Sequence, residues 1–259
     1  LLTFNERLRI NGEILSDEEW VKSFEKIEVA RSKKPDCKLT FFEVSTLAAI
    51  LLVEKLNPDI GIFEIGLGGR LDAVNLLDND CSILTSIDLD HQSFLGNSRA
   101  EIGLEKAHVV RSNKPIIISE KNVPIEVLDF IKNTKSKLSL IGKDFNFKKN
   151  GNQWTWLGKE KKRHGLPMPA LRGSHQIINA AAAITCIELL SSDFPVSQGA
   201  IRHGLASVEL PARFQVLPGK PSIILDVAHN EAAAKMLSKN LDAIGFFPQT
   251  IGVVGMLND

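Results

Sequence analysis

The sequence predicts an α/β protein with a mostly parallel sheet flanked by helices, and three observations lead to this fold class. Short apolar runs rich in β-branched residues occupy residues 59–66, 81–88 and 114–119. Runs of this kind, bounded by turn residues, are typical of parallel strands that are covered on both faces. Helical patterns alternate with these runs along the chain. Finally, 259 residues with 44% hydrophobic content supply a sizeable core.

Helices are expected on both sides of the first strand. The spacing Ser16-Asp17-Glu18-Glu19 is a capping box ahead of a helix over about residues 17–33. The nearly continuous apolar run over residues 40–56 predicts a second helix, which Asn57-Pro58 ends. A further Ser-x-x-Glu box opens a helix within residues 98–113, between the second and third strands.

The pattern changes in the middle of the chain. Residues 144–158 alternate apolar and polar side chains around Asn150-Gly151, a strong hairpin signal, so an antiparallel extension is expected there. The Ala-rich run over residues 174–190 predicts a helix suited to close packing. The charged stretch 158–165 is interpreted as a solvated turn.

A second α/β region is expected toward the C-terminus. The chain is Pro-rich and irregular over residues 206–222, and a strand, a helix and a further strand at residues 250–256 follow. We therefore expect a domain boundary near residue 210. It separates a central domain over residues 1–210 from the start of a Rossmann-like domain over residues 211–259.

Composition excludes several classes of function. Thirty-one basic and thirty-one acidic residues give a net charge near zero, which argues against a nucleic-acid or anionic-membrane surface. The three cysteines are too far apart for a disulfide framework or a zinc-ligand pattern. No apolar run reaches the roughly 20 residues needed to span a bilayer, and charges interrupt the start of the chain, where a signal peptide needs an apolar core. We therefore expect a soluble, cytoplasmic protein whose partner is a small molecule or another protein, with no nucleic acid and no membrane.

Polar side chains follow two neighbouring predicted strands. Glu64 closes the first strand, and Asp88, Asp90 and His91 follow the second. The carboxyl ends of parallel strands share one edge of the sheet, where α/β folds bind ligands. An acid and an imidazole at this edge could hold a divalent metal such as Mg²⁺. Taken alone, His91 would be interpreted as an ordinary hydrogen-bonded loop histidine.

A glycine turn at residues 66–69 lies directly behind Glu64. Glycine adopts positive φ without penalty, so a tight turn explains these residues. A dinucleotide-binding fold also places glycines here, but Leu71 breaks the G-x-G-x-x-G fingerprint. The segment between Gly69 and Cys81 is also too short for a crossover helix. A dinucleotide-dependent oxidoreductase is therefore kept only as a distant alternative.

Six motifs occur in order along almost the entire chain: FEIGLGGRLDAVN, TSIDLDHQSFLG, IGLEKAHVV, GSHQIINAAAA, PARFQ and LDVAHN. In this order and spacing they resemble folylpolyglutamate synthase and dihydrofolate synthase, the folate branch of the Mur ligase family. The resemblance implies a Mur-ligase-like ATPase domain over residues 1–210 and the start of a glutamate-ligase domain over residues 211–259. It also implies an ATP-dependent amide ligase, in which ATP phosphorylates a substrate carboxylate and the amino group of L-glutamate attacks the acyl phosphate. The acceptor would be dihydropteroate, the γ-carboxyl of a (tetrahydro)folate, or both.

The resemblance assigns the metal-side residues. Glu64 and His91 match magnesium ligands, and Lys106 matches a lysine that is carbamylated in the family and helps to hold a second metal. From its own context, Lys106 would be interpreted as an exposed helix lysine paired with an acid. Carbamylation requires the neutral amine, so it requires burial that lowers the pKa of Lys106. Glu43 matches a residue that assists at the phosphate site, and the expected catalytic residues are Lys106, His91 and Arg213.

The resemblance also assigns contacts to the other substrates. Arg213 matches an arginine that reaches the ATP phosphates, a role suited to an always-charged planar fork. Asn179 matches a nucleotide-contacting asparagine, and Asp226 and His229 match residues that approach the ribose and phosphates. The residues that fall in the family's pterin-side loop are Arg70, Leu71, Asp72 and Ala73.

The implied ligands are ATP, one or two Mg²⁺ ions with room for K⁺, L-glutamate, and dihydropteroate or folates, and the implied state is a monomer. The family's glycine-lysine phosphate loop is absent, and the chain begins on Leu1 rather than Met. We therefore expect a fragment with little turnover of its own, and the alternative function is a pterin- or nucleotide-binding fragment without activity. Smaller departures are Ala212 for the usual Gly, Val74 for a frequent Thr, and Glu231 for a common Pro.

Overall fold

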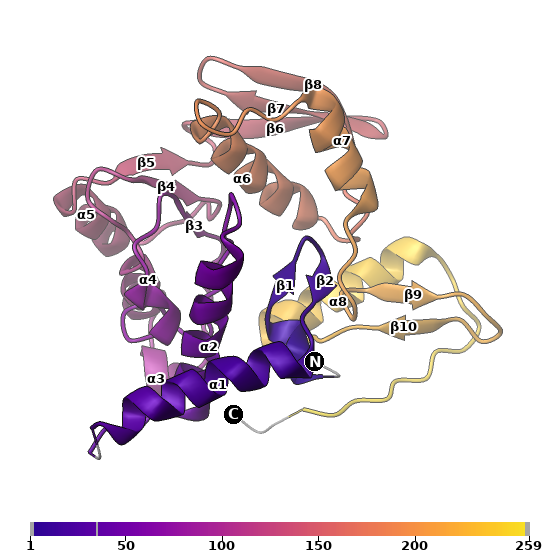
Figure 1. The fold of residues 1–259 in the computed structure, drawn as a ribbon. Coiled ribbons are helices and arrows are strands. Elements are labelled where there is room, and N and C mark those ends of the chain that lie inside the picture. The colour runs from indigo at the N-terminus through magenta and orange to yellow at the C-terminus, as the bar shows by residue number, and fades with distance from the viewer. Residues whose placement is uncertain (1–2, 35, 257–259) are drawn as a thin grey trace. The chain divides into compact units, whose positions relative to one another are not determined.

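The computed structural model describes residues 3–34 and 36–256. Two compact units divide the chain, Leu1–Asp78 and Asn79–Asp259, and Figure 1 shows the helices and strands of each. Within the described residues, no helix is both long enough and apolar enough to cross a membrane. The domain boundary expected near residue 210 stays a prediction.

Two packed helices form the first unit. Both helices predicted for this part of the chain are confirmed, and a small aromatic and aliphatic core that includes Trp20 and Leu52 lies between them. The box expected at Ser16 is wrong, because the Ser16 side chain makes no capping hydrogen bond. The elements of this unit are η1 (Phe4–Arg7), β1 (Arg9–Ile10), β2 (Glu13–Ile14), α1 (Asp17–Ser32), α2 (Phe41–Leu56) and η2 (Ala73–Leu76).

A different capping box fixes the start of α2. The Thr40 hydroxyl accepts a hydrogen bond from the Glu43 N–H at 3.2 Å, and the Glu43 carboxylate accepts one from the Thr40 N–H at 2.7 Å. These bonds lower the pKa of Glu43, because they favour its charged form. Glu43, expected at a phosphate site, thus serves as a helix cap in this structure.

The strand predicted over residues 59–66 is wrong. Residues 59–65 belong to no strand of the described chain, and Ile62 is 94% exposed. A buried parallel strand requires a hydrogen-bonded neighbour, and within the first unit the described strands are the two-residue β1 and β2, which pair with each other. The apolar, β-branched composition favours a strand, but composition does not supply the hydrogen-bonded partner that a strand needs.

The second unit contains the predicted parallel sheet, with strand order β3-β4-β5. Its first two strands and the helix α4 were predicted, whereas β5 and α5 were not. At Gly103 of α4 an added Cβ would lie 2.7 Å from Val127 Cγ2, so the approach of α4 to α5 requires glycine. The elements of this part are β3 (Ser82–Leu84), α3 (Gln92–Leu95), α4 (Arg99–Ala107), β4 (Pro115–Ile118), α5 (Ile125–Asn133) and β5 (Lys137–Leu140).

An antiparallel sheet follows, with strand order β6-β7-β8. The hairpin predicted at Asn150-Gly151 is confirmed, with Asn150 paired to Gln153 and Gly151 at φ +59°. The turn predicted over residues 158–165 is wrong in its second half, because β8 begins at Lys162 and pairs with β7. Along β8, exposed residues alternate with partly or fully buried ones at the start of the strand, as expected for a sheet with one solvent-exposed face. The strands are β6 (Phe145–Asn150), β7 (Gln153–Gly158) and β8 (Lys162–Pro167).

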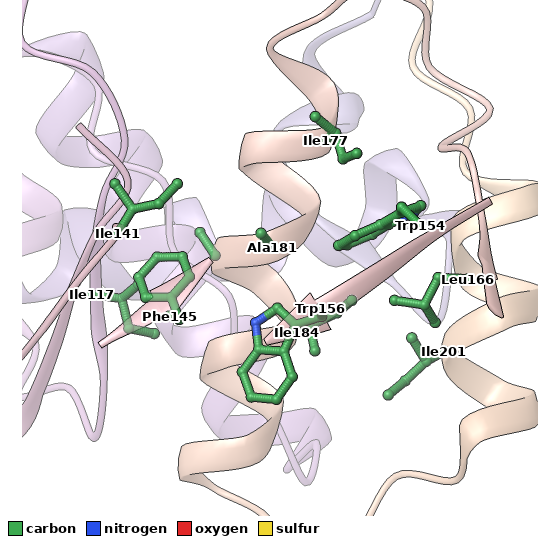
Figure 2. Packing of buried hydrophobic residues seen from close by; sticks show 11 residues of the cluster. Ile117, Ile141, Phe145, Trp154, Trp156, Leu166, Ile177, Ala181, Ile184 and Ile201 are labelled. Carbon is green, nitrogen blue, oxygen red and sulfur yellow. The ribbon is translucent and has the colours of Figure 1, made fainter. Parts of the chain in front are cut away.

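The helix α6 (Gln176–Leu189) was predicted from its alanines and joins the two sheets. Its Ala181 and Ala182 are buried in a cluster that includes Ile117 of β4 and Trp154 of β7. Figure 2 shows this cluster, to which α7 (Gln198–Ser207) adds Ile201. The short alanine side chains let the helix backbone lie close to strands of both sheets.

The C-terminal part combines one confirmed strand and one confirmed helix with two departures from the prediction. β9 (Gln215–Leu217) lies in the stretch predicted to be irregular and pairs antiparallel with β10 (Ile223–Leu225), and α8 (Glu231–Ile244) follows. The strand predicted over residues 250–256 is not formed, and Val253 is 96% exposed. As with residues 59–65, a strand-like composition here has no hydrogen-bonded neighbour.

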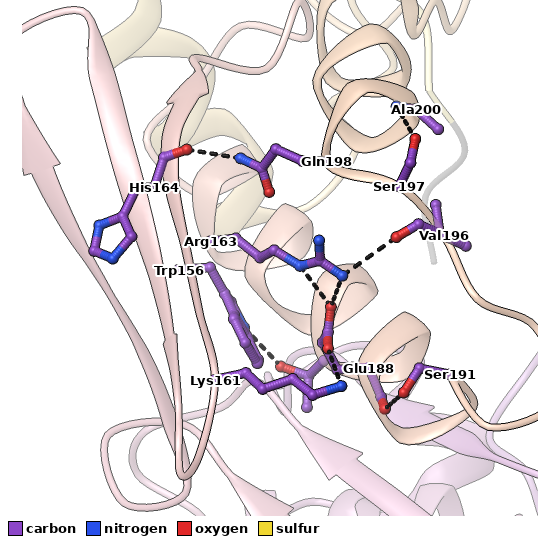
Figure 3. Close-up of polar contacts among 11 residues, drawn as sticks. Trp156, Lys161, Arg163, His164, Glu188, Ser191, Val196, Ser197, Gln198 and Ala200 are labelled. Atoms are coloured by element: carbon purple, nitrogen blue, oxygen red, sulfur yellow. Dashed lines mark hydrogen bonds and ion pairs between the residues drawn. The ribbon is translucent and has the colours of Figure 1, made fainter.

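A buried ion pair fixes β8 to α6. Arg163 Nε donates to Glu188 Oε1 at 2.7 Å, and Arg163 Nη2 also donates to the carbonyl oxygen of Val196 at 3.2 Å (Figure 3). The Glu188 side chain is only 7% exposed, and Lys161 lies 3.3 Å from its second oxygen. A buried carboxylate is costly unless it is paired, so Arg163 and Glu188 stabilise the sheet only together.

We predict that Arg163→Met destabilises the second unit by about 2 kcal/mol, because it leaves the Glu188 carboxylate with Lys161 alone. Urea denaturation measures the free energy of unfolding. The matched control is Lys22→Met, which breaks the exposed Lys22–Glu18 pair on α1 and should leave stability nearly unchanged. Equal effects of the two substitutions would contradict the prediction.

Candidate functional site

The loop after β3 presents the polar residues predicted at the sheet edge. Ile87 is fully buried, whereas Asp88 is exposed and Asp90 and His91 are half-buried. His91 is the N-cap of α3 and adopts left-handed φ and ψ of 48° and 42°. Its backbone N–H donates to Asp90 Oδ1 at 2.9 Å, and its Nε2 lies 3.9 Å from the same oxygen. A left-handed conformation costs a non-glycine residue about 1–2 kcal/mol, so this hydrogen bond helps to hold an unfavourable backbone.

Lys106 of α4 lies at the same edge. Its Nζ donates to the carbonyl oxygen of Ser86 at 3.2 Å, and its side chain is partly buried. Burial lowers the pKa of Lys106, and the charges of Asp90 and Asp88 partly oppose this shift. Lys106 is therefore not a fully exposed helix lysine, and its pKa is shifted in the direction that carbamylation requires.

The glycine turn in the first unit is organised by Asp72. Asp72 Oδ2 accepts from the N–H groups of Gly66 and Leu67 at 3.0 and 2.9 Å, and Oδ1 accepts from the Val74 N–H at 2.9 Å. Asp72 thus closes the turn and caps η2. The turn leads into a four-residue 3₁₀ helix rather than the long helix of a dinucleotide fold, so the oxidoreductase alternative gains no support.

The residues around this turn face solvent. Glu64 and Arg70 are exposed, Leu71 is 83% exposed, and Ala73 begins η2. Glu64 belongs to the first unit, whereas His91 and Lys106 belong to the second, and each is placed within its own unit. The set predicted to bind metal stays a prediction.

The donor types at the edge of β3 suit a hard divalent cation, because they are carboxylates and one imidazole. They fall short in number: among the described residues, no group of three or more His, Cys, Asp or Glu side chains is placed to hold a metal ion. Asp90 also uses one oxygen for a backbone N–H. Metal binding at this edge stays a prediction.

Arg213 lies between two residues with left-handed backbones. Ala212 has φ +56° and Phe214 has φ +50°, and the Phe214 side chain is buried. Asp226 Oδ2 accepts from the Phe214 N–H at 2.8 Å, and Oδ1 accepts from the Ala228 N–H at 2.8 Å. Asp226 thereby fixes the backbone that carries Arg213, whose own side chain is exposed.

Two further predicted residues lie at the ends of helices. His229 is exposed, and its Nδ1 lies 2.7 Å from the carbonyl oxygen of Val227, which can only accept, so Nδ1 carries the proton. Asn179 is exposed on the first turns of α6 and donates to Gln176 Oε1 at 3.4 Å. Both side chains are accessible to a ligand.

The sequence prediction missed His175. This residue is the N-cap of α6, and its Nδ1 is buried without a hydrogen-bond partner among the described residues. Burial lowers the pKa of His175, the Asp226 charge raises it, and the Arg213 charge lowers it further, so His175 lies within electrostatic reach of both. A histidine directly before an Ala-rich helix was the available signal. A cavity of about 120 Å³ lies nearby, lined by Arg172, Gly173, Phe214, Asn240, Ala243 and Ile244.

Together these features define a class of protein: an α/β protein that gathers carboxylates, an imidazole and a lysine at the carboxyl edge of a parallel sheet, where such folds bind small ligands. Comparison of sequences gives the particular relatives. The dihydrofolate synthase/folylpolyglutamate synthases of Buchnera aphidicola (subsp. Acyrthosiphon pisum) and Escherichia coli are 39% and 38% identical over the whole chain. This chain spans 61% and 59% of their lengths. No protein-family model matches the chain.

Comparison of structures agrees. The chain matches Escherichia coli FolC in complex with DHPP and ADP with a TM-score of 0.88 and 38% identity, over 96% of this chain and 58% of that one. It matches a bifunctional folylpolyglutamate synthase/dihydrofolate synthase with Mn, AMPPNP and L-glutamate bound with a TM-score of 0.85 and 41% identity, over 94% and 57%. The resemblance indicated by the six motifs is therefore confirmed along the whole chain, in sequence and in fold.

We predict that Ala212→Gly stabilises the chain by about 0.5–1 kcal/mol. Glycine adopts φ +56° without the steric penalty that alanine pays there. The greater conformational entropy of glycine in the unfolded chain offsets only part of this gain. Urea denaturation again measures the change. In the control Ala183→Gly, an exposed helical alanine is replaced, and a loss of about 1 kcal/mol is expected. The prediction fails if both substitutions destabilise the chain.

Proposed function

We propose that the protein containing this chain is an ATP-dependent amide ligase that adds L-glutamate to dihydropteroate, to the γ-carboxyl of a folate, or to both. The observation that carries this proposal is the likeness over the whole chain to folylpolyglutamate and dihydrofolate synthases, whose structures hold ADP, or Mn with AMPPNP and L-glutamate. We also propose that the protein is a cytoplasmic monomer.

The reaction requires two transfers. The γ-phosphoryl group of ATP passes to a substrate carboxylate and gives ADP and an acyl phosphate. The neutral amine of glutamate then attacks the acyl carbon, an amide bond forms and phosphate leaves. The protein contributes mainly by positioning anionic groups and stabilising their charge.

The nucleotide-side residues of this chain suit the first transfer. Arg213 supplies an always-charged planar fork for phosphate oxygens, and Asp226 holds its backbone in place. The exposed His229 presents Nε2, because Nδ1 donates to a carbonyl oxygen. Asn179, at the start of α6, is assigned to the nucleotide.

The metal-side residues would be Glu64, His91 and a carbamylated Lys106. A divalent cation held there, Mg²⁺ in our proposal with room for a second Mg²⁺ or K⁺, would neutralise phosphate charge. The chain's own contribution is to place these side chains. Asp90 and α3 set the backbone of His91, and α4 brings the Lys106 amine beside the end of β3.

The acceptor substrate is assigned to the loop of the first unit. Arg70 and Leu71 extend from the turn that Asp72 closes, and Ala73 follows at the start of η2. Arg70 would attract the carboxylates of a pteroate or folate, and the largely exposed Leu71 offers apolar surface to a ring system.

We predict that release of ADP by the protein containing this chain requires both L-glutamate and a pteroate-type acceptor, because the acyl phosphate needs both to reach product. A coupled ADP assay with each substrate left out in turn measures this.

Arg213→Met should lower kcat/KM at least about tenfold, corresponding to loss of one charge-assisted contact. Equal ADP release with a muramyl precursor in place of the pteroate would contradict the folate assignment.

We predict that ¹³CO₂ adds covalently to Lys106. Because burial lowers its pKa, the folded chain holds the neutral amine at a lower pH than an exposed lysine does, so labelling should rise with pH ahead of surface lysines. ¹³C NMR of protein in labelled bicarbonate detects the carbamate, and Lys106→Arg should remove the signal. Lys22, whose pKa is raised by Glu18, is the internal comparison that should stay unlabelled. A signal that persists in Lys106→Arg would overturn the assignment.

A further inference from the structure

The carboxylate of Asp90 joins two segments that are distant in sequence. Its Oδ1 accepts from the His91 N–H at 2.9 Å, and its Oδ2 accepts from Asn230 Nδ2 at 2.7 Å. The Asp90 side chain is 35% exposed, so water competes only partly for these bonds. Hydrogen bonds to an ionised acceptor are short and about twice as strong as neutral ones.

Both the oxygen and the nitrogen of the Asn230 side-chain amide form hydrogen bonds. Its Oδ1 accepts from the Ala233 N–H at 2.9 Å, which caps α8, while its Nδ2 donates to Asp90. This arrangement fixes the orientation of the amide. If oxygen and nitrogen were exchanged, the oxygen would meet the Asp90 carboxylate and the NH₂ group would meet a backbone N–H.

The two segments carry the two halves of the site. His91 follows Asp90 directly and adopts a left-handed backbone, and it is assigned to the metal. Asn230 follows His229 directly and caps α8, and Asp226 accepts from the Ala228 N–H just before it. Both His229 and Asp226 are assigned to the nucleotide. The Asp90–Asn230 bond therefore links the metal side to the nucleotide side.

We propose that Asp90 and Asn230 form a positioning pair, which holds the His91 loop against the start of α8 and keeps the two sides of the site at a fixed separation. The function that this separation serves rests on the proposed ligase activity. Neither residue is assigned a contact with substrate or with the reacting atoms.

A simpler role must be distinguished, in which Asn230 only caps α8. Serine is also a good N-cap but is too short to bridge to Asp90, so Asn230→Ser keeps the cap and removes the link. If capping were the whole role, Asn230→Ser would match the wild type in every measurement below.

A swap of the two residues tests the pair directly. In N230D, two carboxylates face each other and repel. In D90N, the new amide oxygen still accepts from the His91 N–H, and its NH₂ group then meets the NH₂ group of Asn230. In the double variant D90N/N230D, the amide introduced at position 90 donates to the carboxylate introduced at position 230, which still caps α8. Each hydrogen bond of the wild type then has a counterpart.

Hydrogen exchange followed by mass spectrometry is the first measurement. We expect N230D to speed exchange about tenfold both in the first turn of α8 and in residues 91–96, which corresponds to the loss of one charge-assisted bond. We expect D90N/N230D to return both segments to within about twofold of the wild type. The control Ser197→Ala removes the cap of α7, where Ser197 Oγ accepts from the Ala200 N–H, and should speed exchange in α7 alone. Faster exchange in α8 alone for N230D, or no recovery in the double variant, would overturn the proposal.

Binding of Mn²⁺·AMPPNP by calorimetry, in the protein containing this chain, is the second measurement. We expect N230D to weaken binding about tenfold and the double variant to restore it. If the wild type does not bind Mn²⁺·AMPPNP, the proposed function fails while hydrogen exchange still decides whether the pair exists. If the wild type binds and N230D binds equally well despite faster exchange, the positioning role is overturned and the ligase function stands.

Discussion

The packing of α6 against both sheets is the constraint on which the rest of the second unit depends. α6 contacts β4 on one sheet and β6 and β7 on the other; its buried Ala181 and Ala182 let the helix backbone lie close to the strands, and Ile177 and Ile184 fill the cluster beside them. The same packing sets the position of the N-terminal end of α6, where His175 and Asn179 lie. Arg163 and Glu188 then fix the edge strand β8 to this helix. Larger side chains at the buried alanines of α6 would therefore displace both the antiparallel sheet and the N-terminal end of the helix.

Three aspartates share one structural role. Each accepts a hydrogen bond from a backbone N–H group near a residue that we propose to bind a ligand. Asp72 closes the turn that carries Arg70, Asp226 holds the Phe214 N–H beside Arg213, and Asp90 holds the N–H of His91. A carboxylate oxygen that accepts from backbone N–H groups gains strong hydrogen bonds and fixes local φ and ψ. Two of the three backbones so held are unfavourable ones, the left-handed His91 and Phe214. In the structure these carboxylates hold the backbone beside Arg70, His91 and Arg213, two of which, Arg70 and Arg213, are exposed.

How far the sequence predicts this structure depends on where the partners of each residue lie. The helices α1, α2, α4 and α6 and the hairpin of β6 and β7 follow from local patterns, because capping, periodicity and turn chemistry act over a few residues. The strands expected at residues 59–66 and 250–256 failed, because a strand depends on a neighbour that composition does not identify. The site shows the same division. His91, Lys106 and Arg213 belong to recognisable motifs, whereas the burial of His175 and the bond between Asp90 and Asn230 arise from contacts between distant segments, 140 residues apart in the second case.

The surroundings of Lys106 show how two opposing effects set the chemistry at the edge of β3. Burial favours the neutral amine, whereas Asp88 and Asp90 favour the ammonium, and burial prevails. Asp90 is also the carboxylate that accepts hydrogen bonds from the His91 N–H and from Asn230 Nδ2. The group whose charge opposes the neutral amine of Lys106 is therefore the same group that joins the His91 loop to the start of α8. One side chain thus contributes both to the charge and to the backbone geometry of this edge of the sheet.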